Sequence, residues 1–231
     1  MIESMNVELF RRRAKVHAAL ADPYRLAIAD QLTLGDCAPS ELAASLDIES
    51  NLLAHHLAAL ESVGLIERLV SQGDRRRRYV RLLPEGHRIL QHATPIPARR
   101  VVFICTENAA RSQLAEGIWK QNHPLQAMSA GTKPARRIHA EAIRAAARRG
   151  IDLSHAEPRA IPELDPGDLI VTVCDRAHED LPPTLGQLLH WSVPDPATSS
   201  APDAYDAAAE NLAARIDALL PNIEPVKNEP L

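Results

Sequence analysis

Aromatic residues are scarce in this sequence and make up only 3% of its 231 residues. A folded core must therefore be built mainly from Ala, Leu, Ile and Val, within a hydrophobic share of 45%. No apolar run approaches the roughly 18 residues that a membrane-spanning helix needs. The first residues also lack the basic-then-apolar order of a signal peptide. We therefore expect a protein with no membrane partner.

Cysteine and net charge are also low. The three cysteines, Cys37, Cys105 and Cys174, are too few for the disulfide framework of a small secreted domain. The sequence therefore predicts a cytoplasmic protein in a reducing environment. A net charge of −4 excludes a strongly basic chain, so contact with nucleic acid must come from a local basic patch.

The chain is long enough for two domains, and one stretch separates them. Residues 91–100 read QHATPIPARR, with two prolines and no hydrophobic period. We therefore predict a first domain at 1–92, a linker at 93–100 and a second domain at 101–222. The Pro-rich tail at 223–231 is expected to be disordered.

The first domain has the pattern of a mainly α-helical fold with one hairpin. Asp22 and Pro23 indicate a helix start, and Ser50 is expected to cap another helix. Apolar spacing within that helix predicts that Leu53, Leu57 and Leu60 are buried. The predicted helices are 6–20, 23–35, 40–46, 50–64 and 84–91, and the predicted strands are 65–70 and 79–82.

A short helix, a turn, a second helix and a basic hairpin form the plan of a winged helix-turn-helix. In that plan the second helix enters the major groove and wing arginines meet phosphate. The candidate DNA-binding residues are Ser50, Asn51, His55, Arg75, Arg76, Arg77 and Arg78. Two alternatives stay open: the arginines form an ordinary solvated turn, or the helix makes no base contact.

Three stretches resemble the arsenic-responsive (ArsR-type) repressor family: ADPYRLAIADQL, SELAASLDIESNLLAHHLAALESVGLI and GDRRRRYVRL. The resemblance implies a homodimer on double-stranded operator DNA, paired through residues 6–20 and 84–91. Arsenic sensors of this family often carry a Cys-x-Cys pair. Only Cys37 lies in that region here, so we expect it to be structural.

Strands and helices alternate in the second domain, which predicts a four-stranded parallel sheet with helices on both faces. The predicted strands are 101–105, 125–129, 168–174 and 188–193, and the predicted helices are 112–121, 139–149 and 203–220. In such sheets the ligand lies beyond the carboxyl ends of the strands. Because Cys105, Cys174 and Asp195 each follow a strand, we expect them at one edge.

The stretch VVFICTENAARSQ, residues 101–113, has the form of an anion cradle. Loop N–H groups and a helix N-terminus favour negative charge, including a thiolate at Cys105. Arg111 can grip two oxygens of a tetrahedral anion. The predicted anion-binding residues are Thr106, Glu107, Asn108, Ala109, Ala110, Arg111 and Ser112. Asp195 is the candidate proton donor. The alternatives are a buried core cysteine at 105 and a plain Asp-Pro turn at 195.

The pattern C-x5-R-S with Asn108 inside it resembles the low-molecular-weight tyrosine phosphatase superfamily, which includes arsenate reductases. HWSVPDPA, SAGT and GIDLSH resemble the reductase branch, and Ala197 stands where phosphatases have an aromatic residue. The resemblance implies that Cys105 attacks arsenate with help from Asp195. Cys174 or an external thiol (thioredoxin, glutaredoxin or mycothiol) then releases arsenite. No bound cofactor or metal is expected.

The sequence thus predicts a transcriptional regulator fused to an arsenate reductase that acts in arsenic resistance. One alternative is a phosphatase acting on phosphotyrosine or small phosphate esters. Another is an inert sensor whose bound oxyanion controls DNA binding. Two departures bear on these alternatives: Leu181 stands where some relatives have a third cysteine, and Glu107 would repel an anion if it pointed inward.

Overall fold

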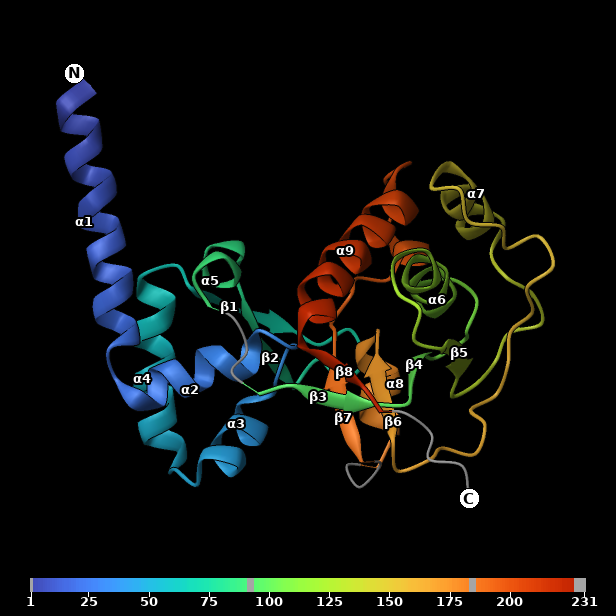
Figure 1. The fold of residues 1–231 in the computed structure, drawn as a ribbon, viewed down its shortest axis with the longest axis horizontal. Helices are drawn as coiled ribbons and strands as arrows, with labels where there is room; N and C mark the ends of the chain where they lie inside the picture. The colour runs from blue at the N-terminus through green and yellow to red at the C-terminus, as the bar shows by residue number, and fades with distance from the viewer. Residues whose placement is uncertain (1, 91–93, 183–185, 227–231) are drawn as a thin grey trace. The chain divides into compact units, whose positions relative to one another are not determined.

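The computed structural model describes residues 2–90, 94–182 and 186–226, and it divides into two compact units (Figure 1). The first unit comprises Met1–Val70 and Arg77–Ala93, and the second comprises Ser71–Arg76 and Thr94–Leu231. None of the described helices combines the length and the apolar character needed to cross a membrane.

The first unit is helical with one antiparallel hairpin, as the sequence predicted. Strands β1 and β2 pair with Ile66 opposite Leu82 and Val70 opposite Arg78. The helices are α1 (Ile2–Leu20), α2 (Pro23–Leu32), α3 (Pro39–Leu46), α4 (Ser50–Ser62) and α5 (Pro84–Ile89), and the strands are β1 (Ile66–Val70) and β2 (Arg78–Leu82).

Local sequence signals explain most of these helix ends. The Asp22 carboxylate accepts a hydrogen bond from the backbone N–H of Arg25 at 3.0 Å, as expected of an N-cap. Gly64 follows α4 with φ of +72°, a conformation that glycine adopts without strain. The prediction for Ser50 was wrong. Glu49 is the N-cap of α4 and makes no side-chain cap bond, while Ser50 is the first helical residue.

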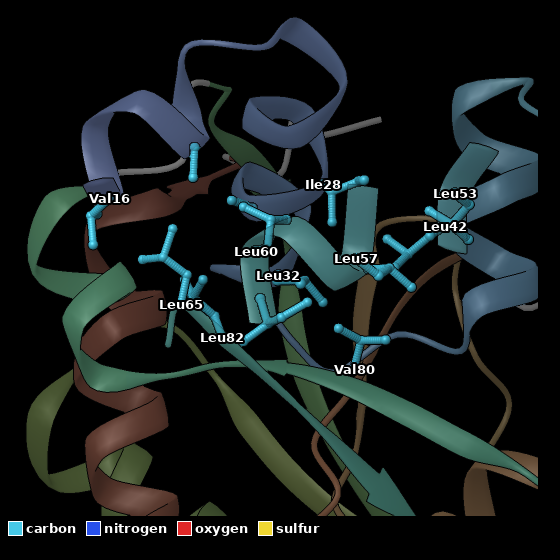
Figure 2. Close-up of a cluster of buried hydrophobic side chains, with 13 residues drawn as sticks. Val16, Ile28, Leu32, Leu42, Leu53, Leu57, Leu60, Leu65, Val80 and Leu82 are labelled. Atoms are coloured by element: carbon cyan, nitrogen blue, oxygen red, sulfur yellow. The ribbon is translucent and has the colours of Figure 1, made fainter. Parts of the chain in front are cut away.

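The core of the first unit is aliphatic (Figure 2). The i, i+4, i+7 positions Leu53, Leu57 and Leu60 are all buried, as their spacing predicted. Leu57 is 1% exposed, so truncating it to Ala should cost about 2–5 kcal/mol. Hydrophobic burial by α2, α4 and the hairpin therefore holds this unit together.

The second unit contains the predicted four-stranded parallel sheet, in the order β5-β4-β6-β7. Strand β4 lies between β5 and β6, with Cys105 opposite Gly131 and Ile104 opposite Thr172. The chain adds β5 on one side of β4 and later adds β6 and β7 on the other side, so the strand order reverses at β4. The strands are β4 (Arg100–Cys105), β5 (Ala127–Gly131), β6 (Asp168–Thr172) and β7 (Gln187–His190).

Helix α6 packs on β4 and β5 and against α9, while α8 contacts β4 and β6. Three aromatic residues pack together in this core, where the Phe103 ring lies 5.9 Å from Trp119 and 6.0 Å from Trp191. The helices are α6 (Arg111–Asn122), α7 (Ala140–Arg148), α8 (Asp175–Asp180) and α9 (Ala204–Leu219), with short 3-10 turns at Pro196–Thr198 and Leu220–Asn222.

Three elements of the second unit differ from the sequence expectations. Ile96–Ala98, inside the expected linker, forms β3 and pairs in parallel with β8 at Ile223–Pro225, inside the expected disordered tail. Each strand has three residues and a proline, a composition that argues against a strand. Residues 227–231 of that tail lie outside the described residues. Helix α8 was also missed, because its six residues carry no hydrophobic period.

Candidate functional site

Residues Thr106–Ala110 form a loop between β4 and α6, at the carboxyl end of the central strand where the strand order reverses. Backbone carbonyls of Thr106, Glu107 and Ala109 accept hydrogen bonds from the segment 133–139. Asn108 has φ of +51°, a left-handed conformation that asparagine tolerates better than most residues. The loop is therefore held in a tight turn around the end of β4.

The sulfur of Cys105 faces this loop. The backbone N–H of Asn108 donates to Sγ at 3.2 Å, and the Ser112 hydroxyl lies 3.0 Å from Sγ. Cys105 is 3% exposed. Both contacts suit a thiolate, which accepts hydrogen bonds. This geometry supports the predicted cradle rather than an inert core cysteine.

Arg111 begins α6 and lies close to Asp195. Their side chains form an ion pair at 2.9 Å, and the Arg111 guanidinium also donates to the carbonyl of Val193 at 3.0 Å. Asp195 accepts a hydrogen bond from the backbone N–H of Ala197 at 3.1 Å. The Arg111 guanidinium and the Asp195 carboxylate therefore meet directly, and the charges of Arg111 and of Cys105 both act on the Cys174 thiol.

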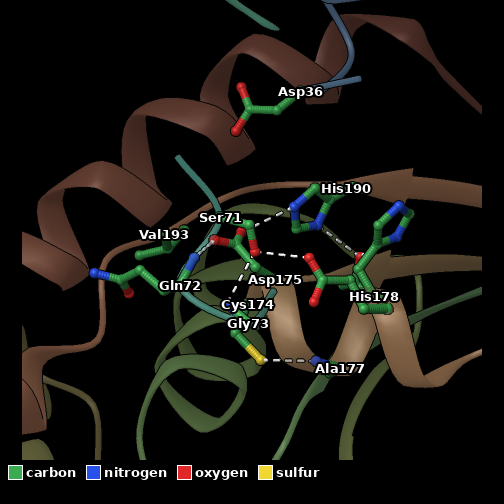
Figure 3. Close-up of polar contacts among 12 residues, drawn as sticks. Asp36, Ser71, Gln72, Gly73, Cys174, Asp175, Ala177, His178, His190 and Val193 are labelled. Carbon is green, nitrogen blue, oxygen red and sulfur yellow. Dashed lines mark hydrogen bonds and ion pairs between the residues drawn. The ribbon is translucent and has the colours of Figure 1, made fainter. Parts of the chain in front are cut away.

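Cys174 lies beside the cradle, not within a strand as the sequence predicted. Strand β6 ends at Thr172, and Cys174 caps α8 by accepting a hydrogen bond from the Ala177 N–H at 3.4 Å (Figure 3). The Thr106 hydroxyl lies 3.4 Å from its sulfur. Burial raises the pKa of Cys174, although Arg111 lowers it in part. Burial therefore favours the neutral form of the Cys174 thiol, which lies beside Thr106 of the loop.

Buried polar residues lie on both sides of Cys174 in the sequence, with Thr172 before it and Asp175 and His190 after it (Figure 3). His190 Nε2 lies 3.1 Å from the Asp175 carboxylate, and His190 Nδ1 lies 2.9 Å from the Thr172 hydroxyl. Burial raises the pKa of Asp175, but hydrogen bonds from His190, the Gln72 backbone and Ser192 bring it below the usual value. This cluster fixes the start of α8 and the end of β7.

Two residues near the cradle were not predicted from the sequence. His139 Nδ1 lies 2.8 Å from the Tyr205 hydroxyl, and His139 Nε2 lies 3.6 Å from the Glu107 carboxylate. Burial raises the pKa of Tyr205, and the Asp195 carboxylate raises it further. The charge of Asp195 therefore acts on the Tyr205 hydroxyl. His139 is the N-cap residue of α7 and Tyr205 lies on α9, so no local pattern marks them.

The same contacts show where Glu107 points. Its side chain is 57% exposed and pairs with His139, so it does not lie among the buried groups around Cys105. The other predicted anion-binding residues remain in the loop and at the start of α6. Thr106 is half-buried, and the buried members are Asn108, Ala109, Ala110, Arg111 and Ser112.

The predicted DNA-binding residues on α4 lie on its exposed face. Ser50, Asn51 and His55 are exposed, whereas His56 is buried. The arginine run spans the turn after β1 and the first residue of β2, and Arg75, Arg76, Arg77 and Arg78 are all exposed. The Arg76 guanidinium pairs with Asp74 at 2.9 Å.

The backbone contacts of Cys37 are with strand β2. Its backbone N–H and carbonyl both bond to Val80, at 3.1 and 2.8 Å. Burial raises the pKa of the Cys37 thiol to about 12. These contacts agree with a structural residue.

Known proteins match both parts of the chain. Residues 100–229 match the family described as low molecular weight phosphotyrosine protein phosphatase. Residues 20–68 match a helix-turn-helix domain. The chain therefore joins a helix-turn-helix region to a phosphatase-like α/β domain, as predicted.

Individual relatives are arsenate reductases. One from Brevibacillus brevis is 34% identical over 124 residues, which are 51% of this chain and 91% of the relative. One from Bacillus subtilis is 36% identical over 103 residues, 42% of this chain and 73% of the relative. A solved arsenate reductase from Archaeoglobus fulgidus is 31% identical with a TM-score of 0.46, covering 52% of this chain and 98% of that structure.

Proposed function

The chain belongs to the low molecular weight phosphotyrosine protein phosphatase family, and from this premise we propose that its second unit reduces arsenate to arsenite while its first unit binds operator DNA. The observation that carries the enzymatic proposal is a second thiol, Cys174, adjoining the Cys105 cradle through Thr106. A phosphatase needs no such thiol. The similarity to arsenate reductases supports the same choice.

In the first step the Cys105 thiolate attacks the arsenic atom of arsenate. One arsenic–oxygen bond breaks, and Asp195 donates a proton to the departing oxygen, which leaves as water. Arg111 and the loop amides hold the remaining oxygens, whose charge is stabilised by preorganised donors. The product is a covalent adduct between Cys105 and arsenic(V).

In the second step a thiolate attacks the Cys105 sulfur. A sulfur–sulfur bond forms, the sulfur–arsenic bond breaks, and its electron pair leaves with arsenic as arsenite. The two thiols are oxidised as arsenic is reduced. Cys174 is the internal candidate, and thioredoxin, glutaredoxin or mycothiol is the external donor that regenerates the enzyme.

The direct test incubates the reduced protein with arsenate and each of the three donors and measures arsenite. We expect one donor to support turnover and Cys105→Ser to lower the rate by roughly 10³-fold or more, as for loss of other enzymatic nucleophiles. Cys37→Ser is the matched control and should keep the parent rate. No arsenite with any donor, or full activity in Cys105→Ser, would refute the enzymatic proposal.

The second candidate function is hydrolysis of phosphate esters. Tyr205 favours it, because an aromatic side chain near Asp195 and Arg111 can contact the ring of an aryl phosphate. A chromogenic aryl phosphate distinguishes the two activities. Rapid hydrolysis without arsenate reduction would select the phosphatase, and binding of either anion without turnover would select an inert sensor.

For the first unit we propose an ArsR-type dimer on double-stranded operator DNA. The exposed positions Ser50, Asn51 and His55 would face base edges. Arg77 and Arg78 would contact phosphate together with Arg75 and Arg76, which come from the Ser71–Arg76 segment grouped with the second unit. Helix α1 supports the dimer, since Val7, Leu9 and Phe10 are 49%, 53% and 60% exposed. Sedimentation tests this interface: the parent should be a dimer and Phe10→Ser a monomer. A monomeric parent would refute it.

We also propose a first domain at 1–92 and a cytoplasmic location, and we extend the second domain beyond the expected 101–222 to include β3 and β8, which pair with each other. The location is supported by the chemistry, because the relay requires reduced thiols and all three cysteines are free in the structure.

A further inference from the structure

The orientation of the Asn108 side-chain amide determines whether the Ser112 hydroxyl can donate a hydrogen bond to the Cys105 sulfur. Asn108 is fully buried, and its Nδ2 donates to the Ser112 hydroxyl oxygen at 2.8 Å. That hydroxyl then has its own proton left to donate to Sγ, which lies 3.0 Å away. If the Asn108 amide were turned over, its oxygen would take the Ser112 proton away from the sulfur.

Arg159 determines which way this amide lies. The Arg159 backbone N–H donates to Asn108 Oδ1 at 2.8 Å, and Gln113 Nε2 donates to the same oxygen at 3.0 Å. A backbone N–H can only donate, so a reversed amide would place two donors against each other. The main chain at residue 159 therefore orients the donor to the nucleophile.

The segment that carries Arg159 has little regular structure to hold it. It adjoins β5 through one isolated bridge, in which the Gly131 N–H donates to the Arg159 carbonyl at 2.8 Å. Gly131 itself is close to the cradle, because a Cβ there would meet the Thr106 carbonyl oxygen at 2.8 Å. Gln113 Nε2 also donates to the Glu157 carbonyl at 3.1 Å, and the side chain of residue 159 adds a further anchor to these backbone contacts.

The Arg159 side chain supplies that anchor. Its guanidinium binds the Glu116 carboxylate at 2.6 Å and lies 3.4 Å from the Ser129 hydroxyl. The Glu116 side chain is 9% exposed and also accepts from Ser129 and Lys120, each at 2.6 Å. A buried carboxylate with three hydrogen-bond partners has a fixed position. Because Glu116 belongs to α6, it ties residue 159 to the helix that begins with Arg111.

We propose that Arg159 is a positioning residue for catalysis, whose guanidinium, held by Glu116, keeps Asn108 and Ser112 aimed at the Cys105 sulfur. Arg159 does not touch the substrate. The proposal rests on the proposed function only for its effect on turnover, since its effect on the thiol exists without arsenate.

The test measures the rate at which iodoacetamide alkylates Cys105, followed by peptide mapping, in the full-length reduced protein. Arg159→Ala should lower this rate roughly tenfold, within the range of about 10²-fold that small misplacements can cost. It should lower kcat for arsenate by a similar factor with little change in KM. Methylguanidinium added at millimolar concentration should restore most of the alkylation rate.

Arg144→Ala is the matched control, because Arg144 forms a similar ion pair with Glu141 on α7. It should keep the parent rate, and methylguanidinium should not change it. If Arg159→Ala does not fold, Arg159→Gln replaces it, with the same loss expected. A parent alkylation rate in the folded variant, or a loss that methylguanidinium does not restore, overturns the proposal. A tenfold loss in a protein that never reduces arsenate overturns only the proposed function.

Discussion

The two units of the chain bury different kinds of side chain. In the first unit the buried set is aliphatic apart from Tyr79 and a few polar residues such as Asp36 and His56. In the second unit many buried polar groups surround the cradle: Asn108, Arg111, Ser112, Gln113, Glu116, Ser129, Thr172, Asp175 and His190. Apolar burial alone stabilises a fold. Burying polar groups requires partners for each and fixes their directions, which catalysis needs.

The sharpest test of this difference changes the same residue type in both units. Arg111→Lys removes the guanidinium fork from the cradle and should lower kcat/KM for arsenate by about 10²- to 10³-fold. Arg81→Lys makes the same change at Asp36, a buried ion pair of the first unit at 2.9 Å. It should leave kcat/KM within about twofold, since it removes no group from the cradle. Equal losses in both variants would contradict the comparison.

Truncating a core residue of the first unit should lower stability and leave activity unchanged. Leu57→Ala opens a cavity in the first unit and should reduce the free energy of unfolding by about 2–5 kcal/mol. Turnover of arsenate at 25 °C should stay at the parent value, because no cradle residue belongs to that core. Denaturant unfolding and a steady-state assay measure both quantities. A large fall in kcat with Leu57→Ala would show that the two functions are not separable in this way.

A single hydroxyl offers a smaller contrast. Ser112→Ala removes a donor to the Cys105 sulfur and should lower kcat roughly tenfold, the effect of about 1.4 kcal/mol. Ser45→Ala removes a hydroxyl that bonds to Gln31 at 2.9 Å in the first unit. That control should have the parent kcat. If Ser112→Ala also has the parent kcat, the hydroxyl does not assist the thiolate.

The basic run tests the DNA-binding half. Changing Arg76, Arg77 and Arg78 to Glu should weaken operator binding and flatten its dependence on salt, by about one unit of slope for each phosphate that the variant no longer neutralises. Arg136→Glu with Arg137→Glu, two exposed positions of the second unit, is the control and should leave the salt slope unchanged. Operator-binding titrations at several salt concentrations measure this slope. An unchanged slope in the variant at Arg76, Arg77 and Arg78 would show that the wing does not contact DNA.

The smallest expected effect concerns acid stability. The pKa of Asp175 is lowered in the folded state, so the unfolded chain binds more protons near pH 3.8 and stability rises with pH there. This contribution is present above the ordinary pKa and lost as pH falls through the lowered one. Asp175→Asn should therefore flatten the fall in the urea midpoint between about pH 2 and 4. If the urea midpoint of Asp175→Asn falls with decreasing pH as steeply as that of the parent, this assignment is contradicted.

Local signals allowed the sequence to predict much of the fold. The Asp22–Pro23 helix start, the buried Leu53, Leu57 and Leu60, and the four parallel strands depend on neighbouring residues and on periodicity. Errors arose where local signals were equivalent or absent. Glu49 and Ser50 are adjacent possible helix starts, and β3 pairs with β8 across more than half of the chain.

The residues of the candidate site also divide into those that a local motif predicts and those that it does not. Cys105, Asn108 and Arg111 belong to one short motif, so their meeting could be predicted. His139, Tyr205 and Arg159 reach the cradle from three separate segments, and their roles depend on hydrogen bonds between residues far apart in sequence. Only a three-dimensional structure relates them to Cys105.

The central claim is that the Cys105 sulfur forms and then breaks the bond to arsenic. Mass spectrometry of a single turnover, quenched with acid and mapped by peptide, tests it most directly. We expect one arsenite per protein and one new disulfide that always includes Cys105, joined to Cys174 or to the thiol donor. Arsenite released while Cys105 remains a free thiol would contradict the account.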